Sequence, residues 1–259
     1  MALLFSGRTP KGCMQSQYYS LSKPKRSRKR SRAAGNASNS DSDSDTHRHE
    51  IDNRFNIRVI DNAIYFNNDI TRESVFRLNF MLRRLEKSLL ARSACLAELL
   101  GADSDTVTKL AASTPVHLHV TTNGGEIDAA FSCVDCIKGL RVPVVTVVDG
   151  YVASAGTLIT LAGAKRVIMP NAKMLIHQLR TGMWGKHAEL VDQYENSNRT
   201  MEHLIEFYTS HTKIKRKRLE KILKRDVEWN ADECIAVGLV DEIVKPTLSA
   251  AGAPDNEDD

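Results

Sequence analysis

Apolar strand-like segments alternate with helix-like segments through most of this chain, and this alternation restricts its possible folds more than any other feature. The strand-like segments are rich in β-branched residues, and the helix-like ones repeat apolar residues every three or four positions. Strands separated by helices of this length require crossover connections, which predicts an α/β fold with a mostly parallel sheet and helices packed on it. The expected strands are Ile57 to Phe66, Val116 to Val120, Val142 to Val148, Arg166 to Met169, Lys173 to Ile176 and Asp241 to Val244. The expected helices are Thr71 to Leu99, Ile127 to Leu140, a short one before Arg166, Lys186 to His211, Leu219 to Lys224 and Asp232 to Val237.

Residues 95 to 115 fit this alternation less clearly. Leu96 to Leu100 can be read as helix, while Gly101 to Ser113 has the composition of a loop. We therefore expect a variable insertion here.

The length of the chain fits one folded domain with two tails. With 259 residues, of which 42% are apolar, it can bury one substantial core. We predict that residues 51 to 247 form this domain. Residues 1 to 50 have few large apolar side chains after Phe5, and residues 248 to 259 are small and acidic, so we expect both tails to be disordered.

The positive net charge belongs to the first tail. Residues 1 to 50 hold ten Lys and Arg and four Asp and Glu, a net of +6, which leaves −2 for the rest of a chain whose total is +4. The folded body therefore has no expected basic face for nucleic acid. The basic run Lys23 to Arg32 has three interpretations, namely a nuclear-import signal, a solvated polyelectrolyte arm or a cleaved organellar presequence.

The cysteines favour a reducing compartment. Cys13, Cys95, Cys133, Cys136 and Cys234 lack the regular spacing of a disulfide framework, and no export signal is expected before them. We expect an intracellular protein, cytoplasmic first, with the nucleus or an organelle matrix as alternatives because of the basic tail. Cys133 and Cys136 form a CxxC, but no second pair completes a zinc set, so we expect packing cysteines and no metal.

The longest apolar stretch does not predict a membrane span. Val142 to Ala164 contains Asp149, Ser154, Thr157 and three glycines, which a spanning helix would have to hide. We expect a buried strand, a turn and a buried helix, and no membrane partner.

Three segments carry groups suited to acyl transfer, which needs a nucleophile, a base and donors for an oxyanion. The segment VASAG places Ser154 between a strand and a helix, where it is either a nucleophile or a helix N-cap. His177 ends the apolar run MLI and is either a general base or a structural histidine. Gly124 and Gly125 follow a strand and either admit an extended substrate or form an ordinary turn.

Taken together, these segments resemble the proteolytic subunits of the Clp protease family. The motifs TTNGG (121 to 125), ASAG (153 to 156) and MLIHQ (174 to 178) occur in the family's order and spacing. AGAK (162 to 165), PN (170 to 171) and GLVD (238 to 241) also match. The resemblance covers roughly residues 55 to 245 and is strongest from Val116 onward.

The resemblance implies a fold, a set of site residues and an assembly. The fold would consist of superhelical β-β-α repeats, as in the crotonases, with a protruding handle helix at 185 to 211. Ser154 would be the nucleophile and His177 the base, and the amides of Gly125 and Ala155 would form the oxyanion hole. Asp226 would be the third triad member, with Glu228 and Asp232 as close competitors and an exposed surface role as the alternative.

The family also implies partners. The chain would form stacked homo-oligomeric rings that enclose protein or peptide substrates, possibly fed by an AAA+ unfoldase. The chain itself would bind no cofactor, because the unfoldase would use the ATP. The sequence departs from the family pattern at four places. Asn123 and Leu179 replace two common prolines, Lys213 replaces a frequent glycine, and Ala91 to Thr114 is longer than usual. We expect these departures to affect how the substrate strand is held, the size of the ring and the docking of an unfoldase.

Three other functions remain open at this stage. A processing protease of similar fold, such as a capsid-maturation enzyme, would act without an ATPase. An inactive ring subunit would only scaffold active copies. A crotonase-like acyl-CoA enzyme would use backbone donors with carboxylates instead of a Ser and His pair.

Overall fold

A computed structural model describes residues 50–52, 56–101 and 103–245 of the chain. All of them belong to one structural unit, Thr46–Asp259. The expected tails fall outside these residues, apart from the backbone of Glu50, so their predicted disorder stays a prediction.

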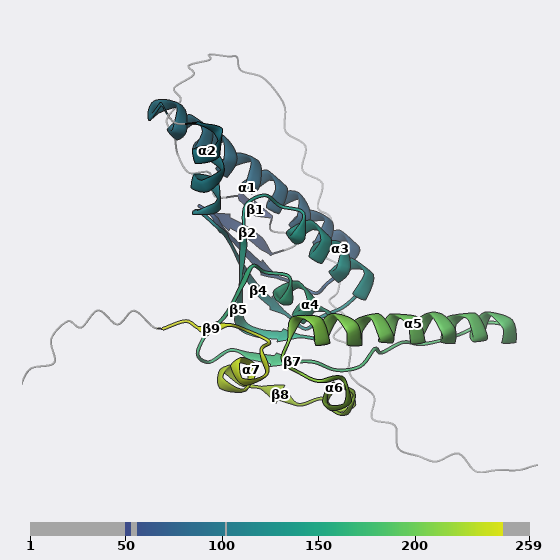
Figure 1. Cartoon of the computed structure of the whole chain (residues 1–259). Coiled ribbons are helices and arrows are strands. Elements are labelled where there is room, and N and C mark those ends of the chain that lie inside the picture. The colour runs from purple at the N-terminus through teal and green to yellow at the C-terminus, as the bar shows by residue number, and fades with distance from the viewer. Residues whose placement is uncertain (1–49, 53–55, 102, 246–259) are drawn as a thin grey trace, which may run out of the picture. The chain divides into compact units, whose positions relative to one another are not determined.

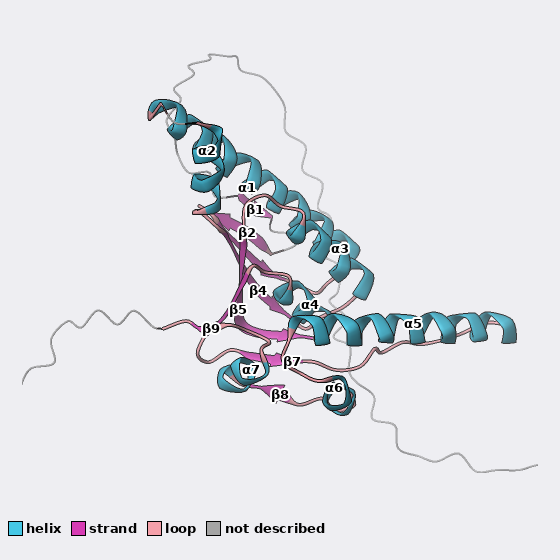
Figure 2. Cartoon of the chain, in the orientation of Figure 1, coloured by secondary structure: helices cyan, strands magenta, loops and turns pink. Residues whose placement is uncertain are grey.

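The described strands form one sheet, and most of its pairings are parallel (Figure 2). Its order is β1-β2-β3-β4-β5-β6-β9, with β7 beside β5 and β8 beside β7. The pairs β1–β2, β2–β3 and β7–β8 are antiparallel, and the remaining pairs are parallel, as predicted. The strands are β1 (Glu50–Asp52), β2 (Ile57–Ile60), β3 (Ala63–Asn67), β4 (Val116–Thr122), β5 (Val144–Ala153), β6 (Lys165–Ile168), β7 (Lys173–Leu175), β8 (Glu228–Trp229) and β9 (Glu242–Ile243).

Helices connect these strands and cover the sheet (Figure 1). The helices are α1 (Arg72–Leu99), α2 (Ser104–Ala112), α3 (Ile127–Lys138), α4 (Ala155–Leu161), α5 (His187–His211), α6 (Arg216–Ile222) and α7 (Ala231–Val237). The start of α1 is fixed by a capping box, in which the Ser74 amide donates to Thr71 Oγ1 and the Thr71 amide donates to Ser74 Oγ. The α/β prediction is confirmed.

The loop predicted at Gly101 to Ser113 is wrong, because α2 occupies most of it. Asp103 caps this helix by accepting a hydrogen bond from the Thr106 amide at 3.0 Å. The Asp at the N-cap position was the available signal, but the many small polar residues that follow it are typical of loops. Residues 95 to 115, where we expected an insertion, therefore consist of the end of α1 and the whole of α2.

Strand β5 is longer than predicted and changes partners along its length. Its first half, up to Val148, lies between β4 and β6. Gly150, with φ +85°, separates this half from Tyr151–Ala153, which pairs with β7. Because β5 and β7 run in parallel, Ser154 follows one strand and His177 comes two residues after the other.

The buried residues of the long helix α5 all lie in its C-terminal half. Its buried residues are Leu204, Ile205, Phe207 and Tyr208. The N-terminal half extends away from the sheet in Figure 1 and carries exposed Val191 and Tyr194. This matches the expected handle helix.

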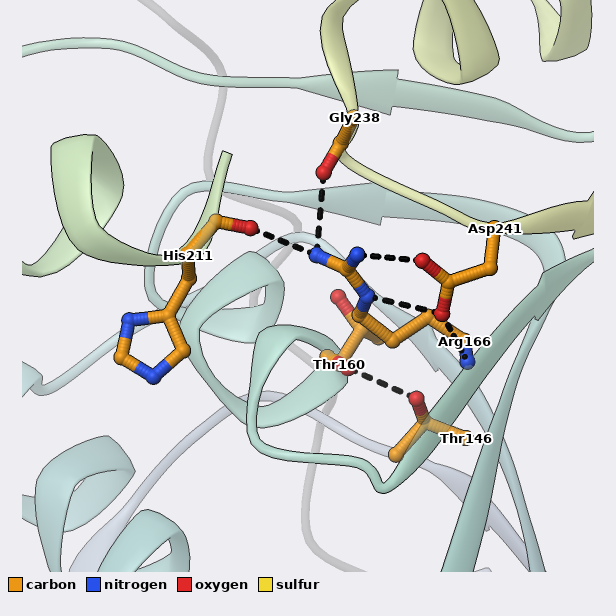
Figure 3. Close-up of polar contacts among 6 residues, drawn as sticks. All are labelled: Thr146, Thr160, Arg166, His211, Gly238 and Asp241. Atoms are coloured by element: carbon orange, nitrogen blue, oxygen red, sulfur yellow. Dashed lines mark hydrogen bonds and ion pairs between the residues drawn. The ribbon is translucent and has the colours of Figure 1, made fainter. Parts of the chain in front are cut away.

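A guanidinium ties three C-terminal segments together (Figure 3). Arg166 on β6 donates to the carbonyls of His211 at 2.7 Å and Gly238 at 2.9 Å, and it forms an ion pair with Asp241. The ends of α5 and α7 and the approach to β9 are thereby fixed to the sheet. None of the helices described is both long enough and apolar enough to span a bilayer.

Candidate active site

The three segments singled out in the sequence meet at one cavity of about 860 Å³. Ser154 and Ala155 reach it from the β5–α4 junction, Gly124 and Gly125 from the loop after β4, and His177 from the end of β7. The cavity is therefore formed at the carboxyl ends of parallel strands, where ligands commonly bind in α/β folds.

Ser154 is held in an unusual backbone conformation. Its φ of 54° and ψ of −127° lie where few non-glycine residues are found, and its amide donates to the Leu175 carbonyl at 2.8 Å. Ser154 occupies the N-cap position of α4, as the alternative interpretation expected, but its side chain makes no capping hydrogen bond to the helix. The hydroxyl remains available at the cavity.

The paired glycines approach their neighbours too closely for side chains. A Cβ atom on Gly124 would lie 2.7 Å from the Cβ of Ser154, and one on Gly125 would overlap the Ile70 carbonyl. Ile70 bridges this loop, since its amide donates to the Gly124 carbonyl and its carbonyl accepts from the Glu126 amide, both at 2.8 Å. The ordinary-turn interpretation does not explain this contact with Ser154.

Several main-chain amides at the cavity have no hydrogen-bond partner within the described residues. Two of them lie on the segments that meet at Ser154: the amide of Gly125, on the loop after β4, and that of Ala155, the first residue of α4. Because both residues line the cavity that Ser154 lines, two donors are available beside its hydroxyl.

His177 is half-buried at the end of the apolar strand β7. Its Nδ1 lies 2.6 Å from the carbonyl oxygen of Gln178, so this nitrogen carries the proton and donates it. The remaining nitrogen, Nε2, is then the basic one. The following backbone is fixed, since the Gln178 amide donates to the Leu223 carbonyl at 2.7 Å.

Asp226 does not line the cavity and is bound elsewhere. Its Oδ2 lies 2.8 Å from Nη2 of Arg180, which does line the cavity. Asp226 comes two residues before Glu228 of β8, and Glu228 pairs with Leu175 of β7. The chain thus brings Asp226 to the strand that carries His177, but within the described residues no hydrogen bond joins the two side chains.

The two competitors for the third position have other surroundings. Glu228 forms an ion pair with Lys173 at 2.9 Å. Asp232 lies in the first turn of α7. Neither residue lines the cavity.

Sequence reasoning missed two residues behind Ser154. Thr157 Oγ1 donates to the Ser154 carbonyl at 2.7 Å and lies 2.5 Å from the hydroxyl of Tyr208. Because the Thr157 proton goes to Ser154, the Tyr208 hydroxyl donates to Thr157. Tyr208 is buried, and burial raises its pKa to about 12. No local sequence signal predicts these linked hydrogen bonds, because Tyr208 lies 51 positions after Thr157.

The CxxC cysteines belong to the core. Cys133 and Cys136 are buried on α3, and burial raises the pKa of both thiols. In the part of the chain that the structure covers, no three side chains of His, Cys, Asp or Glu gather in a metal-binding group.

Comparison with known families identifies the family of this chain. The model of the Clp protease family matches residues 93–247. The chain belongs to the Clp protease family. It is accordingly a hydrolase, a serine-type peptidase, as the motifs of its sequence predicted.

Two proteolytic subunits illustrate the similarity to this family. The chain is 33% identical over 138 residues to the ATP-dependent Clp protease proteolytic subunit 2 of Treponema denticola, covering 52% of this chain and 69% of that one. It is 27% identical over 139 residues to the ATP-dependent Clp protease proteolytic subunit of Deinococcus radiodurans, covering 53% and 68%.

A solved structure agrees in fold. A mutant of ClpP1 from Listeria monocytogenes superposes with a TM-score of 0.58 and 22% identity, covering 72% of this chain and 92% of that one. The expected Clp protease fold is confirmed.

Proposed function

We propose that this chain is an endopeptidase that cleaves unfolded or delivered protein chains through an acyl-enzyme at Ser154. Ser154 Oγ attacks the scissile carbonyl, and Nε2 of His177 takes its proton and later returns it to the leaving amine. Asp226 takes the place of the Gln178 carbonyl as acceptor for Nδ1–H and orients the imidazole.

The tetrahedral intermediate is stabilised by main-chain donors. The amides of Gly125 and Ala155, which lack partners among the described residues, donate to its oxyanion. One arrangement carries the proposal. Ser154 has a strained backbone and a side chain that makes no capping hydrogen bond, and it shares one cavity with His177 and with the amides of Gly125 and Ala155.

Hydrolysis of a short fluorogenic peptide tests these roles. Ser154→Ala should lower kcat by at least about 10⁴-fold, and His177→Asn by a similar factor. A fluorophosphonate should label the wild-type chain and not Ser154→Ala. Ser132→Ala, on α3 and away from the cavity, is the matched control and should retain the wild-type rate. Full activity of Ser154→Ala would remove this residue from the mechanism.

We also propose that the protein works as stacked rings of identical subunits, with the handle helix α5 at the ring–ring contact. Trp184 is 93% exposed just before α5, and Val191 is exposed on it, which is unusual for side chains that stay in water. A closed chamber would supply the selectivity that an open cleft lacks.

Assembly and partner dependence have separate tests. Negative-stain images should show a double ring, and Val191→Asp should reduce the sedimentation coefficient to that of smaller species. Unfolded casein should be cleaved without ATP, while a folded protein should be cleaved only when an AAA+ unfoldase and ATP are added. Cleavage of one folded protein without ATP would instead indicate a processing protease.

A further inference from the structure

Arg180 forms an ion pair with Asp226, whose carboxylate the proposed mechanism assigns to His177 as its partner. Its Nη2 lies 2.8 Å from Oδ2 of Asp226, while Nδ1 of His177 donates to the Gln178 carbonyl at 2.6 Å. The imidazole and the carboxylate are therefore each engaged by another group. This is the arrangement of an incomplete triad.

Both side chains of this ion pair are free to change partner. The Arg180 side chain is 78% exposed and that of Asp226 is 55% exposed, so neither is locked by packing. Asp226 precedes β8, which pairs with β7, and His177 follows β7. A side-chain rotation, without a change in the sheet, is the smallest movement that would redirect the carboxylate.

We propose that Arg180 is a positioning residue that competes with His177 for Asp226 and so holds the peptidase in a restrained state. The inference rests on the proposed function, because it takes Asp226 as the group that orients His177. Arg180 touches no reacting atom in this scheme. It acts only by setting how often Asp226 is available.

Among the described residues, the ion pair of Asp226 is with Arg180. Tyr151, Glu228 and Lys173 lie close by, and the nearby carboxylates of Glu228 and Asp226 help to raise the pKa of the Tyr151 hydroxyl, after burial as the main cause. Lys173 is engaged by Glu228 at 2.9 Å. Arg180 is thus the cation paired with Asp226 among the described residues.

The expected effect is modest because the pair is exposed. Exposed ion pairs shift a two-state population by up to about fivefold. Removing the guanidinium with Arg180→Gln should therefore raise kcat for an uncharged fluorogenic peptide by about two- to fivefold and leave KM unchanged. Arg180→Lys keeps the charge and should stay within about twofold of the wild-type rate.

Ionic strength provides an independent test of the ion pair between Arg180 and Asp226. Raising ionic strength from about 0.02 M to 0.5 M screens exposed charges. The wild-type kcat should rise toward that of Arg180→Gln, whose own kcat should stay constant. Lys173→Met is the matched control, because it breaks another exposed ion pair, on the neighbouring strands. It should retain both the wild-type rate and its salt response.

A double-mutant cycle separates restraint from simple loss of a nearby charge. If Arg180 acts through Asp226, Arg180→Gln should change the NMR chemical shifts of the His177 imidazole in the wild-type background and much less in the Asp226→Asn background. A charge acting directly on the imidazole would give the same change in both. An equal change would overturn the proposal.

The kinetic outcomes also distinguish this proposal from the proposed function. If Ser154→Ala and Asp226→Asn abolish turnover while Arg180→Gln is no faster than wild type, the triad stands and the restraint is wrong. A rise in KM with Arg180→Gln would make Arg180 a substrate contact and would overturn the restraint as well. If Asp226→Asn keeps full activity, the assignment of Asp226 as the third triad member is wrong. The proposed role of Arg180, which depends on that assignment, is then wrong as well.

Discussion

The Cβ atom of Ser154 lies 2.7 Å from the point that a Cβ atom would occupy on Gly124. Real Cβ atoms do not approach that closely, so the loop after β4 contacts the nucleophile only because position 124 has no side chain. The φ of Gly124, +101°, is also one that side chains rarely allow. The loop after β4 and Ser154 are therefore coupled through this contact.

Gly124→Ala should accordingly damage the site more than the fold. The added methyl group must push Ser154 and the Gly125 amide apart, and a displacement of about 1 Å lowers rates by about 100-fold. We expect kcat/KM for a fluorogenic peptide to fall by that factor, with the circular dichroism spectrum of the wild type. Gly182→Ala, where a Cβ atom would meet nothing within 4 Å, should leave the rate unchanged. Wild-type activity of Gly124→Ala would contradict the proposed oxyanion hole.

Thr157 supports the backbone of Ser154, the proposed nucleophile, and its hydroxyl should matter for both stability and rate. Thr157→Val keeps the shape but leaves the buried Tyr208 hydroxyl without its acceptor. It also removes one of the donors to the Ser154 carbonyl, which still accepts from the amide of residue 157. We expect a loss of about 1–3 kcal/mol in the free energy of unfolding by urea, and a severalfold lower kcat. Thr209→Val removes a hydroxyl that bonds only to carbonyls within α5, and it should cost less and leave kcat unchanged. Equal stability losses for the two variants would argue against a special role of Thr157.

The local pattern of the sequence was enough to predict the α/β class and the segments that meet at the cavity. Strand periodicity and the glycine pair identify elements that parallel strands then bring to one edge of the sheet. What could not be predicted depends on contacts between distant side chains. The bond between Thr157 and Tyr208, and that between Arg180 and Asp226, each join positions at least 46 residues apart.

The helix α2 was missed for a different reason. Its segment is rich in Ser, Asp and Thr, which compete with the backbone for hydrogen bonds and are typical of loops. Packing of Ala111 into the core overrides this weak local preference. Similarly, Phe76 and Phe80 repeat at helical spacing but lie exposed on α1, because Val75, Leu78 and Leu82 form its buried face.

Arg166 should be a main determinant of stability in the C-terminal half. Its side chain is only 17% exposed and satisfies the carbonyls of His211 and Gly238 as well as the Asp241 carboxylate. Arg166→Met should lower the free energy of unfolding by about 2–4 kcal/mol, because these partners lose their donor. Arg199→Met, which breaks an exposed ion pair on α5, should cost less than about 0.5 kcal/mol.

The same contact predicts a pH dependence in acid. Hydrogen bonding to Arg166 lowers the pKa of Asp241 in the folded protein. The ionised carboxylate therefore stabilises the fold fully at pH values above its unfolded pKa. This contribution to the free energy of unfolding is lost as pH falls through the lower folded pKa. The difference in unfolding free energy between wild type and Arg166→Met, measured by urea titration, should therefore shrink below about pH 4. A difference that stays constant down to pH 2 would contradict this assignment.

Tyr208 predicts an opposite dependence at high pH. Burial raises its pKa from 10 to about 12, so the folded state holds the proton more tightly than the unfolded chain. This contribution to the free energy of unfolding is complete below pH 10 and is lost as pH rises through 12. About 1 kcal/mol of it is lost by pH 11.

The Tyr208→Phe variant tests this dependence, because it cannot ionise. The free energy of unfolding of the wild type should fall by this amount relative to the variant between pH 9 and pH 11, measured by urea titration with equal m-values. The raised thiol pKa of Cys234 acts on both proteins and cancels in the difference. A difference that does not change with pH would show that water reaches the Tyr208 hydroxyl, and that the support behind Ser154 is looser than its hydrogen bonds imply.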